Sequence, residues 1–419
     1  MNLRTACCAS SLLSFLLVAP TAAQVLRPGD LVVTNYSPPN LFVVDRGGVA
    51  TAVPGAAGAL SGPAGVAASP DGAALVCDFN GNRLVRFAAD GSSSIVASSL
   101  GGPIRVAVDR DGSAIVTAIS PPRIVRVLMN GTVIPLTTFS SSSQRPFGVC
   151  IDPDRSIVFT MDLAPALRRL DPSTGIVTPI AVGAPLRLPQ GVSLFQNGDW
   201  AVIDGVTDSV FRVARATSAI TTWVSNATLA GNPEGIWPSD DGGFFVAQSA
   251  ANNNRIALID AAGATTTFTQ GPPFSNIEDC ARLPELRGPL APLVTGPGGQ
   301  AVLSLDHGST SAARPYSIVL SGGAWQGFPL PADPRAFTID GDSLFVATFM
   351  SDIPPFFVGF TGLLDASGRA NGAIDLSFLP PGLLAGVTLY AQAFDLVPPG
   401  PYGGYDFGRF SNVAALRFQ

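Results

Sequence analysis

An internal repeat occupies the first two thirds of this 419-residue chain and constrains its fold more than any other feature. Each copy reads as four short apolar runs separated by turns, and Asp-Gly between such runs indicates a hairpin, because the turn needs positive φ. A four-stranded unit with a period of 40 to 44 residues is typical of a β-propeller. Five copies of the unit P-x-G-V-A-x-x-x-D-G-x-x-x-V-x-D begin at Pro63, Pro103, Pro146, Pro189 and Pro233.

The two ends of the repeat predict the number of blades. Residues 29–45 align with the second and third strands of the unit, so the first strand of that copy is missing. Residues 277–284 fit the first-strand template, 44 residues after Pro233. A strand from this end would complete the first blade, close the ring and leave no open sheet edge. We therefore predict an all-β chain with a six-bladed β-propeller over residues 24–287, closed by a C-terminal strand.

The segments that flank the repeat predict an exported chain with a second domain. Residues 1–23 have a short positive end, an apolar stretch and small residues before Ala23, which is the pattern of a signal peptide cut near Ala23. The apolar stretch is shorter than the roughly 20 residues that span a bilayer, and we predict no transmembrane segment. Residues 288–300 form a Pro/Gly-rich linker, and the strand-like runs of residues 301–419 predict a small antiparallel β-sandwich.

The repeat resembles a known family. It is preserved best at residues 63–87, where P-x-G-V-A-x-x-x-D-G is followed by V-x-D and N-R-L-V-R-F, and this pattern resembles the NHL repeat. The resemblance implies a propeller of the superfamily that includes gluconolactonase-like, strictosidine-synthase-like and streptogramin-lyase-like proteins. Residues 362–413 resemble a C-terminal module of exported proteins from planctomycete-type bacteria, which implies export, surface attachment or partner binding.

Polar residues recur at one face of the predicted propeller, around the central channel. The residue after the repeat proline and the residue at the exit of each second strand meet at this face. Two of the only three glutamates in the chain occupy the first of these positions in adjacent blades. We predict that the channel face binds a ligand through Glu234, Glu278, Asp204, Asp78, Asn35, Gln248, Gln190 and Phe147.

The oxygen atoms at this face also suit a hard cation such as Ca²⁺ or another divalent ion. Gluconolactonase-like relatives hold one divalent ion at the channel mouth with Glu, Asn and Asp, so the resemblance implies Glu234, Glu278 and Asp204 as candidate metal ligands. Two other interpretations remain open. The aspartates at the second-strand exit could cap turns by binding backbone N–H groups, and the glutamates could lie on a solvated rim.

Composition narrows the functional classes. The formal net charge of −6 gives no electrostatic case for nucleic-acid binding. The one histidine, His307, lies beyond the propeller, which excludes a His-assisted nucleophile inside it. His307 follows Asp306 at a predicted strand end, where we expect a surface turn.

These observations favour a secreted or surface-associated binding scaffold that presents its channel face to a protein, peptide or glycan at the cell surface. No catalytic set is recognisable in the repeat, and we expect a monomer. The alternative is a metal-dependent lactone or ester hydrolase, in which the ion polarises the carbonyl and activates water. A second alternative is a structural spacer in a cell-envelope assembly.

Overall fold

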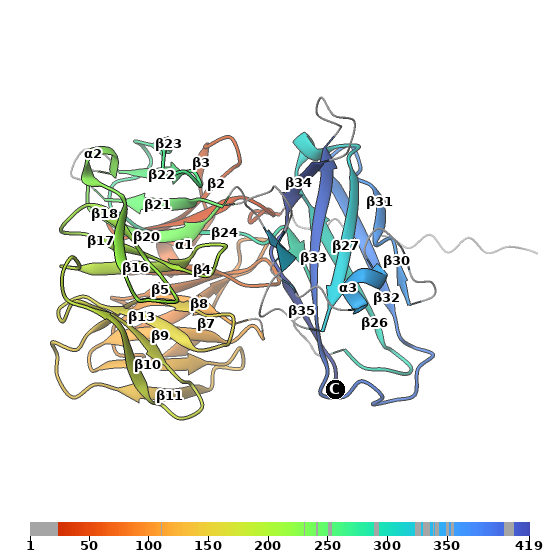
Figure 1. The fold of residues 1–419 in the computed structure, drawn as a ribbon, viewed down its shortest axis with the longest axis horizontal. Helices are drawn as coiled ribbons and strands as arrows, with labels where there is room; N and C mark the ends of the chain where they lie inside the picture. Colours follow the sequence, from red (N-terminus) through yellow and green to blue (C-terminus); the bar gives the residue numbers. More distant parts are fainter. Residues whose placement is uncertain are drawn as a thin grey trace, which may run out of the picture.

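The chain folds into two β-domains that lie side by side (Figure 1). The computed structural model describes residues 24–109, 111–229, 231–239, 242–249, 254–288, 293–322, 328–329, 336–337, 339, 343–348, 352, 356–397 and 406–419. The predicted signal peptide at residues 1–23, with its predicted cleavage near Ala23, lies outside the described residues.

The first domain is the predicted six-bladed propeller, because it contains six four-stranded antiparallel sheets. Within each sheet the strands follow one another from the channel outwards, and the first strands of neighbouring blades lie side by side around the ring. Blade 1 contains β24(Ile277–Arg282), β1(Leu31–Asn35), β2(Asn40–Val44) and β3(Ala50–Ala52), and blade 2 contains β4(Pro63–Ala68), β5(Ala74–Asp78), β6(Arg83–Phe87) and β7(Ser93–Ser98). Blade 3 contains β8(Pro103–Val108), β9(Ala114–Ile119), β10(Pro122–Val127) and β11(Val133–Thr138), and blade 4 contains β12(Pro146–Ile151), β13(Ile157–Met161), β14(Ala166–Leu170) and β15(Val177–Val182). Blade 5 contains β16(Pro189–Leu194), β17(Trp200–Asp204), β18(Ser209–Val213) and β19(Ile220–Val224), and blade 6 contains β20(Pro233–Pro238), β21(Phe244–Gln248), β22(Arg255–Ile259) and β23(Thr265–Gln270).

The repeat sequence explains these blades locally. Gly72 and Gly112, in the turns between first and second strands, have φ of 84° and 78°, which glycine adopts without a steric cost. The second strands are almost wholly buried, whereas the outermost strands β7, β11 and β23 consist mostly of exposed and partly buried residues. The core therefore lies between blades, where Val32 of blade 1 packs in one cluster with Val66 and Phe87 of blade 2.

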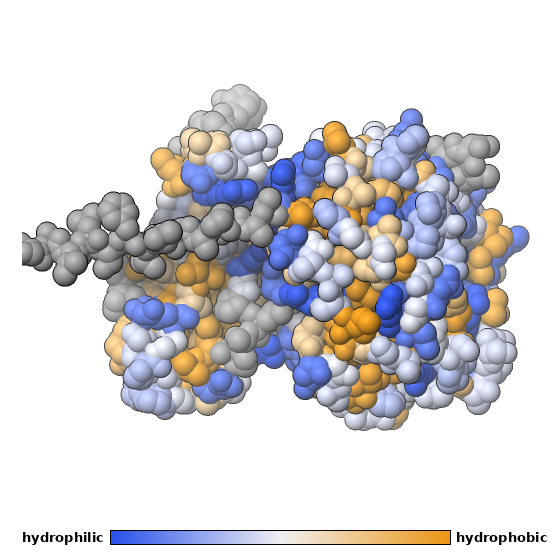
Figure 2. Space-filling view, turned by 180° about the vertical axis from the view of Figure 1, so that it is seen from behind, coloured by the Kyte–Doolittle hydropathy of each residue, from blue (hydrophilic) through white to orange (hydrophobic). Residues whose placement is uncertain are grey.

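The outside of the propeller carries hydrophobic residues interspersed with polar ones (Figure 2). The exposed large hydrophobic side chains of the propeller are spread over several blades, among them Val49, Ile95, Ile134, Leu163 and Ile176. Single exposed hydrophobic residues of this kind are normal on soluble proteins and need no binding partner.

The ring closes as the sequence predicts. Strand β24 pairs antiparallel with β1, with Val33 opposite Cys280. Asn35, at the end of β1, strengthens the closure, because its Oδ1 accepts the backbone N–H groups of Ser275 and Asn276 at 2.9 and 3.0 Å.

The second domain is a β-sandwich, as predicted. One sheet contains β25(Leu286–Arg287), β26(Gln300–Asp306), β32(Arg369–Asp375) and β30(Phe357–Val358), and the other contains β31(Thr361–Leu363), β27(Pro315–Ser321), β33(Thr388–Val397), β34(Asp406–Phe410) and β35(Ala414–Arg417). Leu286, Leu303, Ile318, Phe360 and Leu416 belong to the core between them. Short elements complete the described part: helices α1(Ala56–Ala59), α2(Asn226–Leu229), α3(Ser343–Thr348) and η1(Ser309–Ser311), and the hairpin β28(Phe328–Pro329)–β29(Ala336–Phe337).

The sandwich packs against one face of the propeller, where the first strands end. Arg417 of the sandwich donates from Nη2 to the carbonyl of Asp111 in the β8–β9 turn, at 3.1 Å. Helix α2, which precedes β20, lies on the far side of the propeller from the sandwich (Figure 1). The face where the first strands begin is thus the one turned away from the sandwich. None of the helices in the described part of the chain has the length and hydropathy needed to cross a bilayer.

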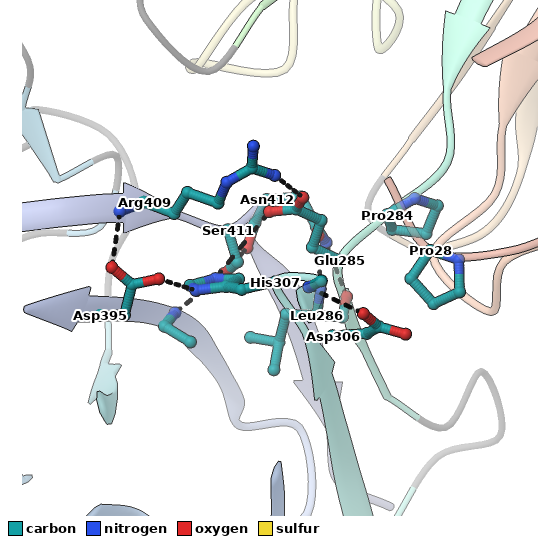
Figure 3. A network of polar contacts seen from close by, with 12 residues as sticks. Pro28, Pro284, Glu285, Leu286, Asp306, His307, Asp395, Arg409, Ser411 and Asn412 are labelled. Atoms are coloured by element: carbon teal, nitrogen blue, oxygen red, sulfur yellow. Dashed lines mark hydrogen bonds and ion pairs between the residues drawn. The ribbon is translucent and has the colours of Figure 1, made fainter. Parts of the chain in front are cut away.

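A buried polar cluster joins the two domains (Figure 3), and we name Glu285, Arg46, Arg282, Arg409, His307 and Asp395 the junction cluster. The expectation of a surface turn at His307 is wrong: its side chain is fully buried and its Nδ1 lies 2.9 Å from Asp395 Oδ2. The physical reason is the sandwich topology, which places Asp395 of β33 against the end of β26.

Candidate functional site

The residues after the repeat proline form the mouth of the channel, on the face turned away from the sandwich. Threonines in three of the second strands donate hydrogen bonds to the backbone carbonyls of such residues in the neighbouring blade. Thr117 Oγ1 donates to the carbonyl of Phe147 at 2.6 Å, and Thr160 Oγ1 donates to the carbonyl of Gln190 at 2.6 Å. Thr34 makes the same contact with Ala64. These threonines were not predicted, although each directly precedes the exit residue of its strand.

Four charged side chains from the three strands β8, β20 and β24 meet at this mouth, and we name them the mouth cluster: Arg105, Glu234, Glu278 and Asp279. Arg105, only 3% exposed, lies with Nη2 3.3 Å from Glu234 Oε2 and Nη1 4.0 Å from Glu278 Oε2. Its Nε lies 3.7 Å from Asp279 Oδ2. The structure therefore brings together the two predicted glutamates, and it adds two residues that the sequence analysis did not select.

The repeat contains a signal for both missed residues. The unit has glycine two positions after its proline, at Gly65, Gly148, Gly191 and Gly235, whereas the remaining two blades have Arg105 and Asp279 there. A Cβ on residue 65 would lie 2.6 Å from the Cα of Arg105, and one on residue 235 would overlap the Asp279 carboxylate. The neighbouring glycines thus leave the space that the two charged side chains fill.

Burial and mutual charge set the protonation of the mouth cluster. Burial raises the pKa of Glu278 to about 9, reinforced by the charge and the hydrogen bond of Glu234 and opposed by Arg105. Burial also raises the pKa of Asp279 to about 6, against the attraction of Arg105. For Arg105, burial would lower the pKa, but the surrounding carboxylates outweigh it and hold the pKa above its usual value. Near neutral pH the cluster therefore holds one proton on its glutamate pair.

Replacing Glu278 by glutamine is expected to flatten the pH dependence of stability between pH 5 and 9. In the native chain the folded state keeps a proton that the unfolded state loses above about pH 4.5, so the stabilisation is full at low pH and is lost as pH rises toward 9. Glutamine has no proton to lose, and the E278Q variant should be the more stable one at pH 8.

Urea unfolding of both proteins at pH 5, 7 and 9 measures this effect. Asp171→Asn, at an exposed turn, is the matched control and should follow the native profile. Parallel profiles for E278Q and the native chain would show that Glu278 ionises normally.

The four predicted residues at the second-strand exits make contacts of a different kind. Asp204 Oδ2 accepts the N–H groups of Arg187 and Leu188 at 2.6 and 2.8 Å, and Asp78 Oδ1 accepts those of Ser61 and Gly62 at 2.8 and 2.9 Å. Asn35 binds residues before β24 in the same way, and Gln248 Nε2 donates to the carbonyl of Leu229. Each side chain thus holds the loop that precedes the first strand of its own blade.

The two remaining predicted residues flank the mouth cluster. The Phe147 ring lies under the Arg105 guanidinium, with Cζ 4.9 Å from the ring centroid. Gln190 is buried, and no hydrogen-bond partner of its Oε1 is found among the described residues. Asn232 donates from Nδ2 to Glu234 Oε1 at 2.6 Å and orients this carboxylate.

Behind the mouth cluster the channel holds a cavity of about 230 Å³. Arg105 and Asp279 contribute to its lining. The rest is mostly apolar and comes from the first strands, including Val106, Val108, Val149, Ile151, Val192, Leu194, Ile236 and Trp237.

The donor set does not fit the divalent ion that the resemblance implies. Within the described residues, no three His, Cys, Asp or Glu side chains are arranged to hold one metal ion. Arg105 places a fixed positive charge 3.3 to 4.0 Å from the carboxylates of Glu234 and Glu278. Asp204, the third predicted ligand, has both oxygens engaged by backbone N–H groups. Metal binding by Glu234, Glu278 and Asp204 stays a prediction that this geometry disfavours.

Comparison with known proteins gives the fold. No family model and no curated protein sequence matches the chain. A chain in the crystal structure of a nidogen/laminin complex is 16% identical, with 60% of this chain and 97% of that one covered and a TM-score of 0.52. A Bacteroides caccae protein of unknown function is 17% identical, with coverages of 61% and 99% and a TM-score of 0.52.

The chain shares the β-propeller fold with these two structures. A gluconolactonase from Xanthomonas campestris is also similar, at 14% identity, coverages of 68% and 95%, and a TM-score of 0.46. At such identities the likeness concerns fold alone, since one propeller scaffold serves many functions.

Proposed function

We propose that this chain is a secreted or surface-associated binding scaffold whose channel mouth takes a cationic group of a protein or peptide. The observation that carries the proposal is the Glu234–Glu278 carboxyl pair on the face turned away from the sandwich. Both side chains retain some exposure, 11% and 16%, while the arginine that partly neutralises them is buried.

The charge balance of the mouth cluster favours a cation. Three acidic groups face one arginine, and burial, together with the charge of Glu234, raises the pKa of Glu278 so that it stays protonated near neutral pH. An ammonium or guanidinium group placed beside Glu234 would release that proton and supply hydrogen-bond donors to the carboxylates. The Phe147 ring already packs against Arg105 and Arg145, whose Cζ atoms lie 4.9 and 5.9 Å from its centroid, and it helps to hold Arg105 beside the carboxylates.

Two further observations support a protein or peptide ligand. A chain of similar fold occurs in the nidogen/laminin complex. The sandwich covers the opposite face of the propeller, which leaves the mouth face to a partner. We propose that the C-terminal module attaches the chain to the cell surface or envelope. We propose that the chain acts as a monomer.

Peptide and glycan arrays probed with the full chain test the proposal. We expect binding to peptides with Lys or Arg, and a loss of about tenfold in E234Q, because a hydrogen bond between charged groups contributes about 1.5–3 kcal/mol. Asp171→Asn removes one carboxylate from a distant exposed turn and should bind like the native chain. Binding only to neutral glycans, or equal binding by E234Q, would overturn the cationic ligand.

The rival functions give different results. A metal-dependent lactone or ester hydrolase requires a stoichiometric ion that is lost in the E234Q/E278Q double variant, together with turnover of lactone or ester substrates. A structural spacer binds neither array, yet is retained in envelope extracts.

A further inference from the structure

A second cavity lies where the propeller meets the sandwich. Its volume is about 220 Å³, and both domains line it. Blade 1 provides Leu31 and Arg46, blade 6 provides Phe245, Leu258 and Phe268, strand β24 provides Arg282, and the sandwich provides Arg409. Junctions between domains are common places for small-molecule sites, because they combine walls from separate elements.

Three of these lining residues are arginines whose guanidinium groups converge. Arg46 Nη2, Arg282 Nη2 and Arg409 Nη1 each lie 3.0 Å from the same oxygen, Glu285 Oε1. Figure 3 shows Glu285 reached by Arg409 of the sandwich. Glu285 thus faces three positive charges at one corner of the cavity, and Asp306 Oδ1 lies 3.9 Å from Arg46 Nη2.

The three arginines at this corner repel one another, and Glu285 and Asp306 oppose this repulsion at Arg46. Burial lowers the pKa of Arg46, and the positive charges of Arg409 and Arg282 lower it further, although Glu285 and Asp306 act in the opposite direction. The Nε of Arg46 is buried, with no hydrogen-bond partner among the described residues. A second anion in the cavity would relieve this repulsion.

The opposite wall of the cavity is apolar. Phe245 and Phe268 meet edge to face with ring centroids 5.1 Å apart, and Leu31 and Leu258 continue the wall. A strongly hydrated inorganic anion would lose water against this wall without compensation, whereas the apolar body of an organic anion would gain from the contact.

We propose that the cavity between the propeller and the sandwich is a binding site for a small organic carboxylate, with its carboxylate at Arg46, Arg282 and Arg409 and its apolar body against Phe245 and Phe268. Guanidinium groups match the planar geometry of a carboxylate and bind it through paired hydrogen bonds. The site is independent of the channel mouth and of the function proposed for it.

Calorimetric titration of the full chain with benzoate tests the site, with benzamide as the neutral isostere and sulfate as the inorganic anion. We expect benzoate to bind and benzamide and sulfate to bind at least about tenfold more weakly, as the loss of a charged hydrogen bond or of the apolar contact predicts. Equal binding of benzamide would overturn the role of the arginines, and equal binding of sulfate would overturn the apolar wall.

Two variants test the arginines and the apolar wall separately. R409Q should weaken benzoate binding about tenfold, and its folding is checked by circular dichroism because Arg409 also contacts Glu285. F268A alters only the apolar wall and should weaken benzoate binding with no change in the arginines. Phe378→Ala, at an exposed position on the sandwich, is the control and should bind like the native chain. Unchanged binding in F268A and R409Q would overturn the site.

Discussion

Replacing Glu285 by glutamine is expected to lower the free energy of unfolding by about 3–5 kcal/mol, as breaking a buried ion pair from one side does. Glu285 Oε1 accepts hydrogen bonds from Arg46, Arg282 and Arg409. Glutamine keeps the shape and one acceptor but removes the negative charge. Three guanidinium groups would then repel one another at the contact between the domains.

Thermal and urea unfolding of the native chain and E285Q measure this loss. Asp375→Asn removes a carboxylate at the end of β32 that accepts hydrogen bonds from Ser377, and it is expected to lower stability by no more than about 1 kcal/mol. Arg46 and Arg282 belong to the propeller and Arg409 to the sandwich, so the variant should also expose the junction to limited proteolysis. A loss below about 1 kcal/mol would mean that water, rather than Glu285, satisfies the arginines.

The junction cluster also makes stability depend on acid. Burial would raise the pKa of Glu285, but the electrostatic attraction of its neighbours, chiefly Arg282, Arg409 and Arg46, outweighs burial and holds this pKa below its ordinary value. Burial is likewise outweighed at Asp395, where the hydrogen bond with His307 contributes to a pKa of about 2. The folded state therefore binds fewer protons, and the stability present above about pH 4.5 is lost as the pH falls toward 2. E285Q should lose less of its remaining stability over this range.

The repeat was sufficient to predict the propeller and its closure. The prolines mark the start of β4, β8, β12, β16 and β20. The strand at residues 277–284 was predicted because this segment fits the first-strand template 44 residues after Pro233. The sandwich was predicted from strand-like runs alone, without its topology. Its strand pairing is long-range, since Ser317 of β27 lies opposite Phe394 of β33, and no local pattern encodes such a partner.

The candidate site was predicted in part, for the same reason. Glu234 and Glu278 hold equivalent repeat positions, so the ring geometry brings them together. Arg105 and Asp279 were not predicted, because they stand at two positions where the residue differs from the repeat. Arg105 and Asp279 replace glycine there, and only the closed ring brings one near the other. His307 was misplaced because its partner Asp395 is 88 residues away.

Replacing Arg105 by methionine is expected to destabilise the propeller by about 3–5 kcal/mol at neutral pH. Arg105 is the positive charge closest to Glu234, Glu278 and Asp279 in the mouth cluster, and it is buried with them. Methionine has a similar length but no charge, so the acidic groups would lose their counter-charge while Asp279 remains almost fully buried.

The pH dependence separates lost charge from lost packing. Asp279 has a pKa of about 6 in the folded chain, above its ordinary value of 3.8, so stability already falls as pH rises through this range. Without Arg105 the pKa of Asp279 should rise further, and R105M should lose more stability at pH 8 than at pH 5. A loss from packing alone would be equal at both values.

A double-mutant cycle with Asp279→Asn tests whether Arg105 stabilises the propeller through Asp279. If Arg105 acts by neutralising Asp279, R105M should cost less in the D279N background than in the native chain, and the difference is the coupling between the two side chains. Additive losses of stability would mean that Arg105 and Asp279, which replace the repeat glycine in two different blades, contribute to stability independently. A coupling of about 1 kcal/mol or more would mean that the two departures from the repeat act as one unit at the channel mouth.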